Sequence, residues 1–190
     1  YKHPEERRAV MEEMREVGVL PSVVTWATLM HSYGENPKEL RGVMAEMRAA
    51  GVVPNVTAWN TLMKSMKNQA TAMRSILEEM QDSDVAPDVY SYSIFLNCLL
   101  YNHGEEIIID VFNTHLKKNP KLVNNFIITS LLRALVVIGD DSEVAAVYKT
   151  YEQKLATKDL RMLQQLAAKP HNADHSTWRV LSELIDESVM

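Results

Sequence analysis

Residues 44–63 read MAEMRAAGVVPNVTAWNTLM, and this stretch decides the fold because related versions of it occur twice more. The pattern stands 33 residues earlier, at residues 11–30, as MEEMREVGVLPSVVTWATLM, and 33 residues later, at residues 77–96, as LEEMQDSDVAPDVYSYSIFL. A Glu, a Met, two Val, a Pro and an aromatic residue keep this period. Self-similarity at a period of about 20 to 50 residues is typical of repeat proteins, so the chain is predicted to be an array of short repeats.

Each repeat is predicted to contain two helices, because apolar residues recur at positions i, i+3, i+4 and i+7. The first stripe of the second repeat consists of Trp59, Leu62, Met63 and Met66. Its second stripe consists of Met73, Ile76, Leu77 and Met80. Asn36 and Pro37 predict the start of the second helix of the first repeat, and Gly51 predicts a left-handed cap at its end.

The spacing of the apolar stripes sets the repeat boundaries. The second stripe of the third repeat falls two residues later than the period requires, at Ile108, Val111, Phe112 and His115. The predicted repeats are 23–55, 56–88, 89–124 and 125–159. A partial repeat at 1–22 contributes one helix, at about 4–17, so the array is expected to begin before residue 1. Residues 160–190 are expected to form a C-terminal helical cap, with helices at about 160–168 and 174–187.

The composition supports an all-α fold. The 190 residues include 6 Gly and 7 Pro, a low share that predicts few and short loops. The single cysteine, Cys98, excludes an internal disulfide and the multi-thiolate sites of zinc and iron–sulfur proteins. No apolar run approaches the about 20 residues that span a bilayer, so no membrane partner is expected. The predicted architecture is a right-handed α-solenoid of stacked helix-turn-helix repeats.

The sequence shows no set of residues that predicts catalysis. His171 and His175 are four residues apart, as two metal ligands on a helix are, but Pro170 places the first of them in a loop. A nucleophile with a base, a glycine-rich phosphate loop and a Cys-x-x-Cys motif are all missing. We therefore expect no enzymatic activity, no metal and no small-molecule cofactor.

Two stretches carry a resemblance to a known family. VVTWATLM at residues 23–30 leads to MAEMRAAGVVPN at residues 44–55, and WNTLM at residues 59–63 leads to EEM at residues 78–80. They resemble pentatricopeptide repeats (PPR) over roughly residues 5–159, more specifically in the first three repeats than in the fourth. The resemblance implies binding of single-stranded RNA in organelles, one base per repeat, through base edges that an unpaired strand exposes.

The resemblance also implies site residues, namely the fifth and last residues of each repeat, which would face the base edge. The pairs are Ala27 with Asn55, Asn60 with Asp88, Ser93 with Asn124, and Thr129 with Asp159. The second residues, which would pack against base faces, are Val24, Thr57, Tyr90 and Phe126. The second, third and fourth repeats would then select uracil, adenine and guanine. Ala27 has no hydrogen-bonding group, so the first repeat is expected not to discriminate.

The same residues have simpler interpretations. Asn, Asp and Ser before a helix are equally typical of N-caps. Trp26, Trp59 and Tyr92 belong to apolar stripes, which favours core packing over base stacking. The chain carries 20 basic and 25 acidic residues, a net charge of −5, whereas binding to phosphates relies on Lys and Arg. Candidate phosphate contacts are Lys64, Lys67 and Arg133, although such residues are more often ordinary solvated charges.

Two functions remain from the sequence. The first is a mitochondrial RNA-binding adaptor for RNA processing, stability, editing or translation, with single-stranded RNA and other proteins of a ribonucleoprotein as partners. The second is a protein scaffold within a mitochondrial ribonucleoprotein, such as a ribosome or an RNA-editing complex. The mitochondrial location is implied by the family resemblance alone. The first residues do not resemble a targeting leader, which says nothing about the destination.

Overall fold

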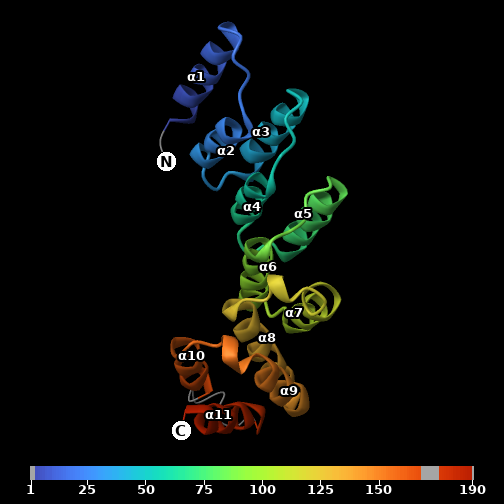
Figure 1. The fold of residues 1–190 in the computed structure, drawn as a ribbon. Coiled ribbons are helices and arrows are strands. Elements are labelled where there is room, and N and C mark those ends of the chain that lie inside the picture. The colour runs from blue at the N-terminus through green and yellow to red at the C-terminus, as the bar shows by residue number, and fades with distance from the viewer. Residues whose placement is uncertain (1–2, 168–175, 190) are drawn as a thin grey trace. The chain divides into compact units, whose positions relative to one another are not determined.

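The computed structural model describes residues 3–167 and 176–189, and its regular secondary structure in these ranges is helical, as the repeat pattern predicts (Figure 1). The helices are α1 (Pro4–Glu16), α2 (Val23–Ser32), α3 (Pro37–Ala49), α4 (Val56–Ser65), α5 (Ala70–Asp82), α6 (Val89–Tyr101), α7 (Glu105–Val111), α8 (Asn125–Ile138), α9 (Asp141–Tyr151), α10 (Thr157–Ala167) and α11 (Ser176–Val189). A π-helical turn at Phe112–Leu116 continues α7, and short 3-10 turns occupy Pro120–Leu122 and Glu152–Lys154. Among the described helices, none is long and apolar enough to cross a bilayer.

The helices form two compact bodies, which we call the N-terminal body (Tyr1–Phe95) and the C-terminal body (Leu96–Met190). In the N-terminal body, α2 packs against α1, α3 and α4, and α4 packs in turn against α3 and α5. Each repeat is thus a hairpin of two helices that stacks on the next repeat. This is the all-α solenoid arrangement that the repeat pattern predicts.

The predicted apolar stripes form the core of the N-terminal body. Trp26 and Trp59 are fully buried and Tyr92 is nearly so, which confirms that this aromatic series packs in the core. Buried side chains of the second helices complete the core, namely Leu40, Val43, Met44, Met47, Met73, Ile76, Leu77 and Met80. Because burying one Leu or Met side chain contributes about 1.5 to 3 kcal/mol, these stripes supply most of the force that stacks the repeats.

The helix ends follow the predicted capping residues. Asn36 accepts a hydrogen bond from the Glu39 N–H at 3.4 Å, and Pro37 is the first residue of α3. Gly51 has a φ of +73°, the left-handed conformation that ends α3. The first helices of the four repeats begin at Val23, Val56, Val89 and Asn125, the first residues of the predicted repeats.

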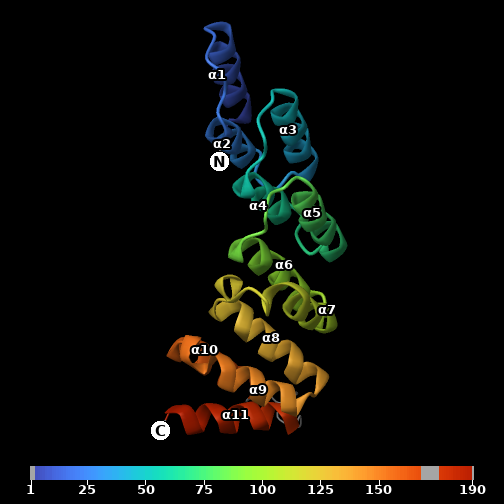
Figure 2. The same cartoon turned by 45° about the vertical axis from the view of Figure 1, so that its right-hand side comes forward.

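In the C-terminal body, the segment predicted as a cap forms one more helical hairpin. Helix α10 packs against α8 and α11, and α11 packs against α8 and α9 (Figure 2). Leu163, Trp178 and Ile185 are buried in these contacts. Helix α10 begins at Thr157, so Asp159 lies inside α10 and not at the end of the fourth repeat. The pair His171 and His175 lies outside the described residues.

The third repeat departs from the predicted stripe at its end. His115 is exposed, and the buried position falls one residue later, at Leu116. The cause is the π-helical turn after α7, in which the Lys117 N–H donates to the Phe112 carbonyl at 2.8 Å. A π-turn accommodates one extra residue in a helix, so the face that packs into the core shifts by one position.

Candidate nucleic-acid interface

The last residues of the first three repeats, which are predicted to face a base edge, stand where the first helix of the following repeat begins. The Oδ1 atoms of Asn55, Asp88 and Asn124 accept backbone N–H groups three residues later at 3.0, 2.8 and 2.9 Å. These are N-cap bonds, so the capping interpretation is confirmed at all three positions. Each bond occupies one oxygen, which leaves the rest of the carboxamide or carboxylate for other contacts.

In the second repeat, the predicted pair Asn60 and Asp88 meets in space. Asn60 Nδ2 donates to Asp88 Oδ1 at 3.2 Å, although the residues are 28 positions apart. Ser91 Oγ lies 2.7 Å from Asn60 Oδ1 and 2.9 Å from Asp88 Oδ1, so its single proton is shared between two acceptors. The three side chains form one hydrogen-bonded cluster that joins α4 to the start of α6.

The cluster contains a carboxylate whose charged form is favoured and an amide that is nearly buried. Burial alone raises the pKa of Asp88, but hydrogen bonds from Ser91, Asn60 and a backbone N–H outweigh burial, so the pKa of Asp88 lies below its ordinary value. Asn60 is only 5% exposed. Its amide orientation follows from its neighbours, because a carboxylate accepts hydrogen bonds and does not donate them. A base that approaches this pair meets a charged acceptor beside a nearly buried amide.

Two of the three predicted cations lie in the N-terminal body, and their surroundings differ. Lys64 Nζ stands 4.8 Å from the centre of the Tyr90 ring, one helical turn after Asn60. Lys67 forms an ion pair with Glu35. Lys64 therefore borders the cluster of the second repeat, whereas the charge of Lys67 is balanced by a carboxylate.

The four residues predicted to pack against base faces lie at the surface. Val24, Thr57, Tyr90 and Phe126 are all exposed. Side chains of this kind at the start of a helix are available to a ligand, unlike the aromatic residues of the apolar stripes. The structure therefore distinguishes the exposed second residues of the repeats from the buried aromatic residues of the apolar stripes, although the two kinds lie close together in the sequence.

The remaining predicted positions have fewer hydrogen-bonding groups available to a ligand. Ala27 is half-buried, and its methyl group has no hydrogen-bonding capacity. Ser93 is half-buried, and its hydroxyl donates to the Val89 carbonyl at 2.7 Å within α6. Asn124 uses Oδ1 for the cap of α8.

The fourth repeat contains a surface cleft of about 440 Å³ between α8 and α10. Its lining comprises Asn124, Asn125, Phe126, Thr129, Ser130, Arg133, Lys158, Asp159 and Met162. Five of these nine residues are predicted site residues. Arg133 and Lys158 make its lining more basic than the chain as a whole.

Within this cleft the hydrogen bonds of Thr129 and Asp159 join each of them to other residues. Thr129 is 4% exposed, and its hydroxyl donates to the Phe126 carbonyl at 3.0 Å. Asp159 Oδ2 accepts the Asn125 Nδ2 amide at 2.9 Å and the Ala156 N–H at 3.0 Å. Asp159 thus lies in the first turn of α10 and not at the end of the fourth repeat, although it lines the same cleft as Thr129. The reason is that Ala156, three residues earlier, occupies the position before α10.

Sequence reasoning missed Ser91, Asn125 and Lys158. A signal for Ser91 exists, because Asp88-x-x-Ser91 matches the capping box that Ser22 forms with Thr25 at the start of α2. Asn125 and Lys158 had no such signal, since their roles depend on where α10 begins.

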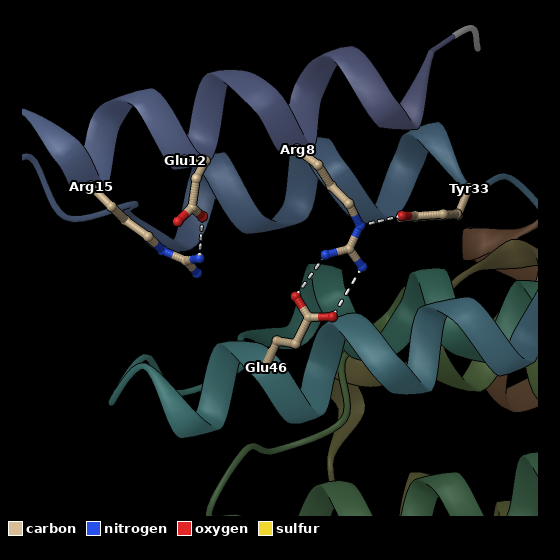
Figure 3. A network of polar contacts seen from close by, with 5 residues as sticks. All are labelled: Arg8, Glu12, Arg15, Tyr33 and Glu46. Carbon is tan, nitrogen blue, oxygen red and sulfur yellow. Dashed lines mark hydrogen bonds and ion pairs between the residues drawn. The ribbon is translucent and has the colours of Figure 1, made fainter.

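Sequence reasoning also missed a row of ion pairs between second helices. Arg8 on α1 donates to both carboxylate oxygens of Glu46 on α3, at 2.8 and 3.0 Å, and to the Tyr33 hydroxyl (Figure 3). Arg41 on α3 makes the same bidentate pair with Glu79 on α5, at 3.1 and 3.0 Å. Hydrogen bonds between the first pair raise the pKa of Arg8 and lower that of Glu46.

The N-terminal body contains a second repeated contact, in which an arginine stacks on a buried tryptophan. Arg15 lies 5.6 Å from the Trp26 ring centre, and Arg48 lies 5.1 Å from the Trp59 ring centre. Both arginines follow the 33-residue period, which was the signal for them. These contacts and the ion pairs stabilise the stack, and they involve none of the predicted site residues.

Across residues 3–167 and 176–189, groups of three or more His, Cys, Asp or Glu that would hold a metal are absent. Cys98 is buried.

Comparisons with known proteins agree with this geometry. The model of the pentatricopeptide repeat domain matches residues 9–69, and the model of the PPR repeat family matches residues 54–100. No curated protein sequence matches the chain.

Among solved structures, the chain is similar to the pentatricopeptide repeat protein PPR10 in complex with an 18-nucleotide psaJ RNA element, with a TM-score of 0.68 and 22% identity over 95% of this chain and 26% of that one. It is also similar to PPR10 from maize, with a TM-score of 0.63 and 16% identity over 99% of this chain and 29% of that one. A third similar structure is the PPR domain of Arabidopsis thaliana protein-only RNase P 1 in complex with tRNA, with a TM-score of 0.54 and 16% identity over 81% of this chain and 83% of that one.

These likenesses concern the fold, and this chain spans only about a quarter of the PPR10 chains. The helical hairpins, their 33-residue period and the two family models together identify residues 9–100 as pentatricopeptide repeats.

Proposed function

We propose that this chain is a single-stranded RNA-binding adaptor that contacts bases with the first helices of its repeats. The observation that carries the proposal is the meeting of Asn60 and Asp88 at 3.2 Å, beside Lys64 and the exposed ring of Tyr90. An amide and a carboxylate offer donors and acceptors to a base edge, an exposed ring offers a stacking face, and an ammonium group offers charge to a phosphate.

The similar structures support this proposal. PPR10 was solved with an RNA element, and the PPR domain of protein-only RNase P 1 was solved with tRNA. The cleft of the fourth repeat adds a second place in this chain where polar groups, an aromatic residue and two cations line one surface.

The adaptor is proposed to act in mitochondria, in RNA processing, stability, editing or translation, together with other proteins of a ribonucleoprotein. It is proposed to act by binding and not by cutting RNA. A labelled strand incubated with the protein and Mg²⁺ should remain intact in a denaturing gel. Cleavage that follows the protein through a final size-exclusion step would contradict this part of the proposal.

The test of RNA binding is a fluorescence anisotropy titration of short labelled single strands that differ at one position. At fixed salt, Asn60→Thr should shift preference at one nucleotide from uracil towards guanine by about 1 to 3 kcal/mol, if the pair acts like a bidentate base contact. Lys64→Gln should instead weaken all strands alike and reduce the salt dependence, because it removes a phosphate contact. Lys38→Gln, which changes an exposed lysine of α3, is the matched control and should leave both properties unchanged.

The alternative function is a protein scaffold within a mitochondrial ribonucleoprotein. Two observations favour it: the net charge is −5, and Asn60 is nearly buried with its amide already bonded to Asp88 and Ser91. If no strand binds more tightly than about 100 μM, the weak end of non-specific binding, the scaffold function replaces the RNA-binding one. Identical base preference for the wild type and Asn60→Thr would retain RNA binding but reject this pair as the base reader.

A further inference from the structure

We propose that this chain forms a symmetric dimer in which one face of α1 packs against the same face of a second copy. We call it the α1 face, and it consists of Arg7, Val10 and Glu13 on α1 with Val24 of α2 beside Val10. The inference concerns the N-terminal body alone and is independent of RNA binding.

The α1 face includes an apolar groove between α1 and α2. The groove has a volume of about 310 Å³, and Val10, Met11, Val24 and Leu29 contribute to its lining. Five of the twelve large apolar side chains that are exposed in the described part of the chain lie between residues 10 and 24, namely Val10, Val17, Val19, Leu20 and Val24. Exposed apolar surface that is concentrated in one place is typical of protein interfaces.

The 33-residue period shows how the same position is used in the following repeats. Val43 on α3 and Ile76 on α5 are the equivalents of Val10, and both are fully buried in the stack. Val10 is 53% exposed. Its side chain is therefore available to a partner.

Arg7 distinguishes the α1 face from the stacking faces of the following repeats. Its equivalents are Leu40 and Met73, which are apolar and buried. Arg7 Nη1 donates to the Thr28 carbonyl at 2.7 Å, which leaves other N–H groups of the guanidinium for a partner. Burial of an arginine is strongly unfavourable unless it meets a carboxylate. The α1 face therefore suits a partner that brings a carboxylate, and not the apolar surface of one more stacked repeat.

Glu13 supplies that carboxylate from the second copy. Its equivalents Glu46 and Glu79 each bond an arginine of the preceding second helix. Glu13 is exposed, and among residues 3–167 and 176–189 it has no ion-pair partner. The α1 face thus carries one arginine and one glutamate that are both open to a partner.

These charges are arranged so that the α1 face complements itself. Arg7 and Glu13 lie three residues before and three residues after Val10, so the three side chains share one side of the helix. In an antiparallel pair of α1 helices with a two-fold axis at Val10, Arg7 lies opposite Glu13 of the second copy, and Glu13 lies opposite its Arg7. Two ion pairs then flank a contact between the two Val10 side chains.

The test is sedimentation-velocity ultracentrifugation of the chain at about 1 to 200 μM, a range that brackets a micromolar Kd. A helix of 13 residues is only about 20 Å long, so the contact is small and a micromolar Kd is expected. The mass should rise with concentration from the monomer value of 21.6 kDa towards twice that value.

Three variants should remain monomeric over the same range. Val10→Glu places a charge in the apolar contact, and Arg7→Glu and Glu13→Arg each place like charges opposite each other. Glu16→Arg makes the same charge change on another side of α1, and this matched control should still dimerise. Circular dichroism melts close to wild type show that the variants are folded.

The decisive sample is a mixture of Arg7→Glu and Glu13→Arg. In this mixture each charged position again faces an opposite charge, so the two variants should form a heterodimer although neither dimerises alone. A mixture that stays monomeric would contradict the antiparallel pairing.

Two other outcomes would overturn the proposal. The first is a wild-type chain that stays monomeric at about 200 μM. If that monomer binds an added peptide of residues 23–55, the α1 face belongs to a repeat hairpin instead. The second is a dimer that survives in both Val10→Glu and Glu13→Arg, because another face would then hold the two copies together.

Discussion

In the second and fourth repeats, an aspartate near the start of the next helix contacts a residue of the repeat's own first helix. The two contacts fall at different positions along that first helix. In the second repeat Asp88 is the residue before α6, and it reaches Asn60, the fifth residue of its repeat. In the fourth repeat Asp159 lies in the first turn of α10, and it reaches Asn125, the first residue of α8.

This difference comes from a three-residue shift in where the next helix begins. A side chain before the helix caps it directly, whereas a side chain in its first turn bonds back to the N–H before the helix, as Asp159 does with Ala156. The same amino acid therefore contacts a different partner in each repeat. A base-reading pair inferred from position in the repeat holds only where the helix start follows the period.

The largest effect is expected from cavities in the two cores. Leu132→Ala in α8 and Leu77→Ala in α5 should each lower the free energy of unfolding by about 2 to 5 kcal/mol. Leu132, which is fully buried, should lose more than Leu77, which is 8% exposed. Urea denaturation followed by circular dichroism measures both losses. Unchanged curves would contradict the assigned buried faces.

A smaller effect separates the two aspartates. Asp88→Ala removes the acceptor of the Ser91 N–H, which caps α6, and the acceptor of the nearly buried Asn60 amide, so a loss of about 2 to 3 kcal/mol is expected. Asp159→Ala removes the bond to Ala156 and an amide contact near the surface, and about 1 kcal/mol is expected. Equal losses in the same denaturation assay would show that the contacts of Asp88 stabilise the fold no more than those of Asp159.

The pH dependence of stability should include a contribution from Asp88 of the second repeat. The pKa of Asp88 is lower in the folded chain than its ordinary value of 3.8, so its contribution is complete above that value. It is lost as the pH falls through the folded pKa, because the protonated group no longer accepts these bonds as well. The stability difference between wild type and Asp88→Asn should shrink from pH 7 to pH 3, and a constant difference would count against this origin.

The smallest loss of stability is expected from the ion pair between α3 and α5. The pair Arg41 and Glu79 is 44% and 39% exposed, so Arg41→Gln should cost about 0.2 to 1 kcal/mol at low salt. The loss should vanish in about 1 M NaCl, where the Debye length is about 3 Å. A larger loss that persists in about 1 M NaCl would show that this ion pair stabilises the protein more than its exposure implies.

The sequence predicted the fold through its period, because Trp59 and its equivalents repeat at the same step as the helix caps. The family resemblance implied the pair Asn60 and Asp88, and these two residues meet because Asp88 precedes α6 and marks the helix start. In the fourth repeat the residue before α10 is Ala156, whose side chain cannot cap, and Asp159 took its place in the prediction. A π-turn after α7 similarly moved the buried position from His115 to Leu116, since the apolar pattern does not show where a helix widens.

The ion pairs of the N-terminal body bear on how such an array lengthens. Helix α3 carries Glu46, which bonds an arginine of the preceding helix hairpin, and Arg41, which bonds a glutamate of the following one. Both bonds join residues 38 positions apart. A tandem duplication of the gene segment for residues 23–55 would therefore place each new glutamate opposite an existing arginine, and the first repeat is compatible with a copy of itself as its neighbour.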